Sequence, residues 1–287
     1  MNILVVGGGI GGVTAAIALA RDGHRVTLLE RQPAFAPVGA GIIMAPNAAR
    51  ALAALGVDLA PHGRELTTLV VTRADGRALS RVEPRRVDAG FGPLWALTRP
   101  ALHAALAAAL PPAVEVSYGA AVEALTEDAG GVEVAALPGR RFELVIGADG
   151  LRSRVREATV GAVAVRYSGV TCWRGVIANP GVTDASEAWG GAARVGLVPL
   201  AADQLYYFLV LTAPRRAPTL AWPDGFAAAF GHFGGDVARV LAALPATSPS
   251  RRWRATSNLP RAVPPASGRP AVRRAPSRKN APSNATP

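Results

Sequence analysis

Apolar and polar residues follow one another in the first 31 positions in a pattern that predicts a strand, a helix and a second strand. The apolar run Ile3–Val6 suits a short strand that is buried on both faces. Apolar positions in 13–20 then recur at helical spacing, and Gly23 is suited to end that helix. The strand predicted next, Arg25–Glu30, ends in an acidic residue.

The same pattern predicts further elements along the chain. Helices are predicted in the second half of Val38–Gly56, over Leu97–Leu110 and over Phe226–Leu244. Strands are predicted at Leu66–Thr72, Ala78–Val82, Val114–Tyr118, Val122–Leu125 and Val132–Ala136, and a buried strand begins at Phe142. We expect the strands at Leu66–Thr72 and Ala78–Val82 to lie in a sheet separate from that of the first strands. From Ala164 onward the pattern is mainly that of strands.

The turn between the first strand and the first helix carries the clearest chemistry. Gly7, Gly9 and Gly12 match G-x-G-x-x-G, in which the glycines permit a tight turn, close approach of a pyrophosphate and close helix packing. Glu30, at the end of the next strand, is placed to accept hydrogen bonds from ribose hydroxyls. The pattern predicts a dinucleotide site; the alternative is a tight turn without a ligand. The motif alone does not separate NAD from FAD.

Length and composition set the limits of the prediction. The 287 residues suggest about two domains, and 50% of them are hydrophobic, which is enough for a sizeable core. No apolar run approaches the roughly 18 residues of a membrane span, and no basic segment precedes the first apolar run, so we expect neither a membrane anchor nor a signal peptide. Cys172 is the single cysteine, which excludes an internal disulfide and favours the cytoplasm.

The net charge of +11 comes mainly from the end of the chain. Nine of the 31 bases and none of the acids lie in 251–287, which leaves 22 bases and all 20 acids in residues 1–250. The end is also rich in proline and serine and shows neither helical nor strand periodicity beyond Thr256. We therefore predict a basic, disordered tail at 251–287. Without interleaved aromatic residues it gives little reason to expect a nucleic-acid partner.

Three segments in a fixed order resemble one known family. They are the first strand–helix–strand unit ending in Glu30-Arg31, the helix that begins Arg99-Pro100, and the turn D-G-L-R-S-R-V-R at Asp149–Arg156. Together they resemble the single-component flavin-dependent aromatic hydroxylases, the group of salicylate, para-hydroxybenzoate and urate hydroxylases. The resemblance covers about residues 1–250, and its β-rich part is most similar to urate- and salicylate-hydroxylase-like members.

This resemblance implies an FAD site built from the first motif. Gly7, Gly9, Gly11 and Gly12 would meet the pyrophosphate, where backbone N–H groups and the helix dipole favour phosphate oxygens. Glu30 would hold the adenosine ribose.

Four more cofactor-binding residues are implied by the resemblance alone. Arg31 would lie against the adenine, Val122 would contact the adenine through its backbone, and Arg99 would reach the flavin-side phosphate or ribityl. Asp149 would serve the region shared by FAD and NAD(P)H. The alternatives are an ordinary turn aspartate for Asp149 and a surface arginine at a helix end for Arg99.

On the substrate side, the resemblance points to two residues. Arg194 and Tyr206 match positions that face the ring substrate in urate-hydroxylase-like relatives, where Arg194 would pair with an anionic or carbonyl group and Tyr206 would hydrogen-bond a ring substituent. The alternative for both is a plain sheet residue. No catalytic side chain is assigned, and the four histidines have no paired spacing that predicts a metal site.

One expected motif is missing from the chain. The family carries a second flavin motif, G-D-A-x-H followed by P-x-x-G-x-G, after its substrate domain, and no such segment occurs here. We therefore expect the C-terminal part of the fold to be missing.

These observations predict an α/β protein with a Rossmann-like FAD-binding domain and a mainly antiparallel β-sheet substrate domain. The predicted domains are 1–72 with 94–160 for FAD, 73–93 with 161–250 for the substrate, and the tail 251–287. The predicted activity is hydroxylation of an electron-rich aromatic or heteroaromatic small molecule with FAD, NADH or NADPH, and O2. A non-catalytic remnant with weak nucleotide binding is the alternative, and an NAD-dependent dehydrogenase is disfavoured because the lone Lys279 follows no tyrosine at the Tyr-x-x-x-Lys spacing.

Overall fold

The chain forms two compact units, each of which combines separate stretches of sequence. The computed structural model describes residues 1–35, 39–87, 92–214, 220–221, 223–244 and 252–257. The first unit contains Met1–Ala36 and Leu110–Val163, and the second contains Pro37–Ala109 and Ala164–Asn258. The units thus divide the chain differently from the predicted domains, because 37–72 and 94–109 group with the β-rich part.

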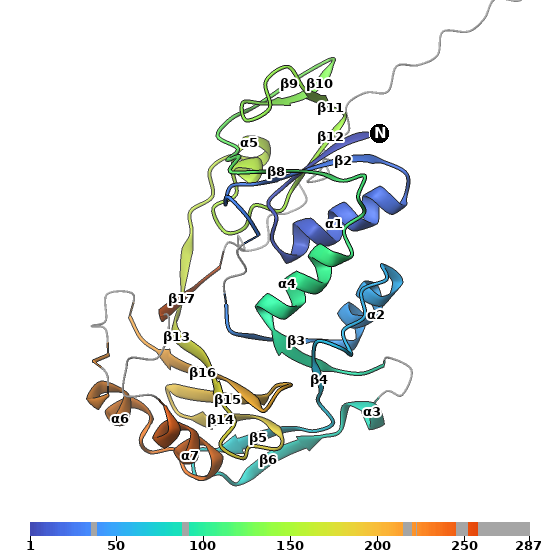
Figure 1. Cartoon of the computed structure of the whole chain (residues 1–287). Coiled ribbons are helices and arrows are strands. Elements are labelled where there is room, and N and C mark those ends of the chain that lie inside the picture. The colour runs from blue at the N-terminus through green and yellow to red at the C-terminus, as the bar shows by residue number, and fades with distance from the viewer. Residues whose placement is uncertain (36–38, 88–91, 215–219, 222, 245–251, 258–287) are drawn as a thin grey trace, which may run out of the picture. The chain divides into compact units, whose positions relative to one another are not determined.

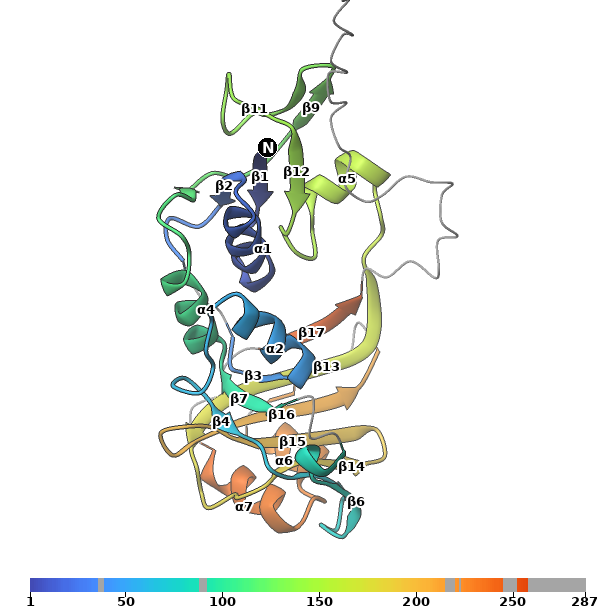
Figure 2. The same cartoon turned by 90° about the vertical axis from the view of Figure 1, so that its right-hand side faces the viewer.

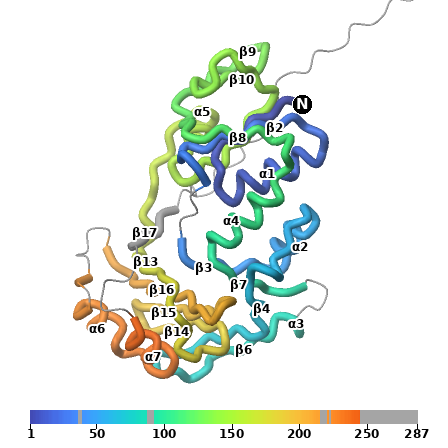
Figure 3. The backbone as a smooth tube through the Cα atoms, viewed as in Figure 1, coloured from blue at the N-terminus to red at the C-terminus, as the bar shows by residue number. Residues whose placement is uncertain are grey.

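The first unit is built on a parallel sheet of four strands in the order β12-β1-β2-β8 (Figure 1). Its elements are β1 (Asn2–Val6), α1 (Ile10–Arg21), β2 (Arg25–Glu30), β8 (Glu115–Tyr118), β9 (Leu125–Asp128), β10 (Gly131–Val134), β11 (Arg141–Phe142), β12 (Leu144–Gly147) and α5 (Arg154–Val160). Blue and green segments lie side by side in this sheet (Figure 3), since Ile3 of β1 pairs with Leu144 of β12. The strands β9, β10 and β11 form a small antiparallel sheet.

Burial explains why the first 31 residues fold as the pattern predicts. Residues Ile3–Val6 of β1 are all buried, and α1 turns Gly12, Val13, Ala16 and Ile17 into the core. Strand β2 returns parallel to β1, so α1 is the connection of a βαβ unit. The predicted ends of β2 are confirmed at both residues.

The second unit contains the larger sheet. Its elements are β3 (Gly41–Met44), α2 (Pro46–Ala54), β4 (Arg64–Glu65), β5 (Leu69–Arg73), β6 (Ala78–Val82), α3 (Pro84–Val87), β7 (Trp95–Thr98), α4 (Arg99–Ala108), β13 (Arg166–Ala178), β14 (Ala185–Gly190), β15 (Ala193–Pro199), β16 (Gln204–Thr212), α6 (Asp224–Phe230), α7 (Gly235–Ala243) and β17 (Arg252–Ser257). Seven strands pair in the order β17-β13-β16-β15-β14-β5-β6. All the neighbours are antiparallel except β14 and β5.

This large sheet is covered differently on its two faces (Figure 2). On one face, Phe226, Phe230 and Val237 of α6 and α7 pack against buried sheet residues such as Trp173 and Tyr207. On the other face, the small sheet β3-β7-β4 and its flanking loops contribute buried residues to a cluster with Val198, Leu200 and Tyr206. The mixed α/β architecture with a mainly antiparallel second sheet is as predicted.

Two predicted elements differ from the structure. Residues 122–124 form no strand, although Val122 is buried in the core of the first unit. The apolar residue there indicates a buried side chain and does not indicate strand pairing. The helical stretch predicted over Phe226–Leu244 is two helices, because the chain turns through glycines at 231 and 234–235, where Gly235 has a φ of +59°.

The start of the predicted disordered tail is a strand. Arg252–Ser257 form β17, which pairs antiparallel with β13 at the edge of the large sheet. An edge strand presents unpaired N–H and C=O groups, so it can order a segment that has little apolar surface of its own. The remainder of the predicted tail, 258–287, lies outside the described residues. None of the described helices has the length and apolar character required to cross a membrane.

Candidate functional site

The glycine turn between β1 and α1 is closely packed at Gly7 and Gly12 and has free space beside Gly9 and Gly11. A Cβ on Gly12 would lie 1.8 Å from the Gly7 carbonyl oxygen, so the helix touches the turn backbone. Gly7 has a φ of +107°, and a Cβ there would lie 2.5 Å from the Ala148 carbonyl oxygen. At Gly9 and Gly11 a Cβ would meet nothing within 4 Å. Gly9 and Gly11 therefore face open space, which is what a cofactor phosphate requires.

The start of α1 adds a partial positive charge to this space. Gly9 is the N-cap of the 12-residue helix, and no side chain caps the first N–H groups. Uncapped N–H groups and the helix dipole attract phosphate oxygens.

Glu30 lies at the end of β2 and binds the turn directly. Its Oε2 accepts a hydrogen bond from the Gly8 N–H at 2.8 Å, and its Oε1 accepts one from the Gln32 N–H at 2.8 Å. The ring of Tyr118 packs edge-on against Phe35, with ring centroids 5.1 Å apart, and burial together with the Glu30 charge raises the pKa of the Tyr118 hydroxyl. The carboxylate is thus fixed at the carboxyl ends of β2 and β8, where parallel sheets bind ligands.

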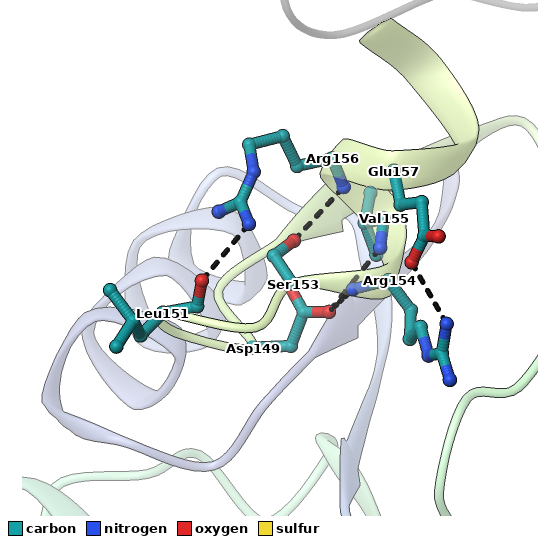
Figure 4. A network of polar contacts seen from close by, with 7 residues as sticks. All are labelled: Asp149, Leu151, Ser153, Arg154, Val155, Arg156 and Glu157. Carbon is teal, nitrogen blue, oxygen red and sulfur yellow. Dashed lines mark hydrogen bonds and ion pairs between the residues drawn. The ribbon is translucent and has the colours of Figure 1, made fainter. Parts of the chain in front are cut away.

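Asp149 organises the turn between β12 and α5 (Figure 4). Its Oδ2 accepts hydrogen bonds from the N–H groups of Arg154 at 2.7 Å and Val155 at 3.3 Å. Ser153 caps the same helix, because its Oγ accepts from the Arg156 N–H at 2.9 Å. Asp149 therefore holds the start of α5, and its role toward the cofactor stays a prediction.

A pocket of about 570 Å³ lies between the start of α1 and this Asp-Gly turn. Gly11 and Ala15 line one side, and residues 146–150 with Ser153 and Arg156 line the other. Asp149 Oδ1 and Arg156 Nε are buried there and have no hydrogen-bond partner in the part of the chain that the structure describes. A buried acceptor and a buried cationic donor without partners are suited to a polar ligand. The glycines, Glu30 and this polar pair fit an adenine dinucleotide such as FAD.

For the remaining predicted cofactor residues, the structure gives a location but no contact with the pocket. Arg31 is exposed just after β2, and the Val122 side chain is buried in the core of the first unit. Arg99 begins α4 in the second unit, where its N–H donates to the Ala40 carbonyl oxygen at 2.8 Å and its side chain lies against Gly39. Their roles toward FAD stay predictions.

The two predicted substrate residues lie on the same face of the large sheet in different surroundings. Arg194 forms an ion pair with Glu187 at 3.1 Å, and Glu187 Oε1 also accepts from the Trp189 indole N–H at 3.1 Å. Tyr206 is 6% exposed, and its ring lies against Gly41. Burial raises the pKa of Tyr206. Sequence reasoning missed Glu187 and Tyr118, which lie in no motif. It also assigned no role to Arg156, although this residue ends the Asp149–Arg156 motif.

The comparisons with known proteins agree with this geometry. Residues 1–216 match the family model described as FAD binding domain. An aurachin C monooxygenase/isomerase of Stigmatella aurantiaca is 38% identical over 223 residues, which are 75% of this chain and 58% of that protein. A 3-amino-4-hydroxybenzoate 2-monooxygenase of Streptomyces platensis is 36% identical over 265 residues, 86% of this chain and 66% of that protein.

Solved structures give the same fold. Klebsiella pneumoniae HpxO in complex with FAD and uric acid superposes with a TM-score of 0.79 at 22% identity, over 89% of this chain and 68% of that one. The chain spans 58% and 66% of the lengths of the two curated relatives. The family match covers most of the chain, and both relatives are named as monooxygenases, one of them of 3-amino-4-hydroxybenzoate. The chain therefore belongs to the FAD-binding family of aromatic-ring monooxygenases.

Proposed function

We propose that this protein hydroxylates an electron-rich aromatic or heteroaromatic small molecule, with FAD as cofactor and NADH or NADPH and O2 as co-substrates. The observation that carries the proposal is that the first unit combines the glycine turn, Glu30 and two buried atoms without hydrogen-bond partners among the described residues, Asp149 Oδ1 and Arg156 Nε. Family membership supports FAD as the cofactor. The names of the relatives support an aromatic substrate.

The residues of the first unit would hold FAD by its polar parts. The N–H groups at the start of α1 would donate to the pyrophosphate, and the open space at Gly9 and Gly11 would let it approach the backbone. Glu30 keeps free lone pairs after accepting from Gly8 and Gln32, so it can also accept from ribose hydroxyls. Arg156 and Asp149 would supply a donor and an acceptor beside the pyrophosphate.

FAD, when bound, supplies the redox chemistry that links NAD(P)H oxidation to oxygen transfer. The protein's own task is to orient the ring substrate and to exclude water from it. The face of the large sheet that carries Tyr206 and Phe208 supports that task, because it offers buried aromatic surface with a hydroxyl.

The direct test is the absorption spectrum of the purified chain. We expect flavin bands in the visible range as isolated, or after FAD is added and the excess removed. A colourless protein that also rejects added FAD would contradict the proposal and would favour the weak nucleotide-binding alternative. Product analysis with a panel of phenolic acids, quinolones and urate then tests ring hydroxylation itself.

Removing the Glu30 carboxylate should weaken FAD binding. Glu30→Ala takes one charged acceptor from the ribose and from the Gly8 and Gln32 N–H groups. We expect the binding free energy to fall by about 1–3 kcal/mol. Flavin fluorescence titration measures the Kd, and Glu127→Ala, at an exposed position of β9, is the matched control. An unchanged Kd for Glu30→Ala would argue against the ribose role.

A further inference from the structure

Tyr118 places an aromatic ring at the edge of the parallel sheet, close to the glycine turn. It ends β8 and is 41% exposed, and no other aromatic residue in the described part of the first unit is exposed to this degree. The carboxyl ends of parallel strands are where such sheets bind ligands, and an exposed ring offers a planar ligand a surface for stacking. Tyr118 is therefore a candidate for contact with a ring of the cofactor.

Glu30 and Tyr118 project from the same face of the sheet. Leu29 packs in the cluster that also contains Leu4 and Val6, so the next residue, Glu30, lies on the opposite face. Glu30 and Tyr118 are partners in the parallel register of β2 and β8, and paired residues of neighbouring strands share a face. Neighbouring strands lie about 4.8 Å apart, so the ring and the carboxylate are neighbours. Burial and the charge of Glu30 raise the pKa of Tyr118, which agrees with this closeness.

Phe35 fixes the ring of Tyr118. The two ring planes meet at 80°, and their centroids are 5.1 Å apart. Phe35 also contacts the glycine turn, since a Cβ on Gly8 would lie 2.9 Å from its Cε1. Tyr118 is thus held from one side and still exposed to solvent. A ring held in this way loses little conformational entropy when a planar ligand stacks on it.

The order of the strands matches the order of the groups in adenosine diphosphate. β1, β2 and β8 are consecutive neighbours in the sheet. The N–H groups at the start of α1, which follows β1, are suited to the pyrophosphate, and Glu30 at the end of β2 is suited to the ribose. A ribose carries its base and its phosphate at opposite ends. A base beyond Glu30 therefore lies over the end of β8, which is Tyr118.

We propose that Tyr118 is the stacking surface for the adenine ring of the cofactor and that Phe35 is the residue that positions it. Tyr118 contributes the face of its ring rather than a hydrogen bond, so phenylalanine can replace it. This contact is additional to those predicted for Arg31 and Val122. The inference rests on the proposed function, because it names a further residue of the same cofactor site.

A fluorescent base tests the stacking in the unmodified protein. The riboside diphosphate of 2-aminopurine has the shape of ADP, and its emission falls when the base stacks on an aromatic ring. The full chain is added to this probe, and calorimetry gives the bound fraction. We expect the bound probe to lose most of its emission and excess ADP to restore it by displacement. A probe that binds with undiminished emission would overturn the proposal.

Variants of Tyr118 link the effect to the ring. Tyr118→Ala should raise the Kd of ADP and of FAD by the same factor, about tenfold, because both ligands carry the base that loses its stacking surface. The probe that saturates this variant should keep its emission. Tyr118→Phe should keep both Kd values within about threefold of the parent's, since the ring remains. Leu79→Ala, at a 55% exposed position of β6, controls for the loss of an exposed apolar side chain.

Two results with the variants would contradict the assignment. One is an unchanged Kd for ADP in Tyr118→Ala. The other is an equal loss in Tyr118→Ala and Tyr118→Phe, which would assign the effect to the hydroxyl. The melting temperatures of both variants should lie within a few degrees of the parent's, because Tyr118 is exposed.

The Kd for FAD of the unmodified chain separates this inference from the proposed function. Chain that binds FAD but leaves the emission of the bound probe unchanged contradicts only the role of Tyr118. Chain that binds neither FAD nor ADP contradicts the proposed function, and this inference with it.

Discussion

Gly12→Ala is expected to unfold or strongly destabilise the first unit. The added Cβ would lie 1.8 Å from the carbonyl oxygen of Gly7, and the backbone of both residues is fixed by the βαβ unit. Relief requires α1 to move away from β1, which would open the core around Val13 and Ile17. We expect a loss of about 3 kcal/mol or more in the free energy of unfolding, at the upper end of overpacking effects. Urea denaturation followed by circular dichroism measures it.

Gly11→Ala is the matched control for this prediction. It adds the same methyl group one residue earlier in α1, where nothing lies within 4 Å. Alanine is the better helix former, so stability should stay the same or rise by about 0.5–1 kcal/mol. Equal stability of the Gly12→Ala protein and its parent would mean that the turn is looser than the structure describes.

Gly9→Val is expected to remove FAD binding and keep the fold. Gly9 has extended backbone with a φ of −74°, and its Cβ would meet no protein atom within 4 Å. Valine is therefore accommodated by the chain, but its methyl groups fill the space that the pyrophosphate needs. We expect the Kd for FAD to rise about 100-fold or more, since the phosphate contacts at the helix start are lost together.

The fold of the Gly9→Val protein is checked by its melting temperature, which should lie within a few degrees of the parent's. Ala104→Val adds two methyl groups at an exposed position of α4 and controls for a general effect of β-branched residues. FAD affinity that survives in Gly9→Val would place the cofactor elsewhere and would contradict the site.

The first 31 residues were predictable because local signals there agree. The spacing of apolar residues, the spacing of glycines and the acidic residue at the end of β2 all indicate one βαβ unit. Each of these signals depends only on residues that are close together in the sequence. The Asp-Gly turn was found through its motif, but its hydrogen bonds to Arg154 and Val155 needed coordinates.

The rest of the site depends on pairing between distant segments, which periodicity does not encode. Glu187 meets Arg194 because β14 and β15 pair in one register, and Arg174 lies near Tyr206 because β13 and β16 do. A shift of either register by one residue would turn these side chains to the opposite face. Strand β17 was missed for a related reason: its order comes from the edge of β13.

Two neighbouring strands of the first unit's sheet, β1 and β12, are far apart in the sequence, and this affects how the sheet forms during synthesis on the ribosome. β1 is an inner strand whose two neighbours are β2, some twenty residues onward, and β12, which pairs Leu144 with Ile3. At about 5–20 residues per second, β1 waits roughly 7–30 s for β12 to be made. Throughout that delay one side of β1, whose residues Ile3–Val6 are all apolar, has no neighbour from its own chain. Nascent protein is therefore most exposed to chaperones and to aggregation before residue 147 emerges, and slowing translation over 37–109 should lower the soluble yield.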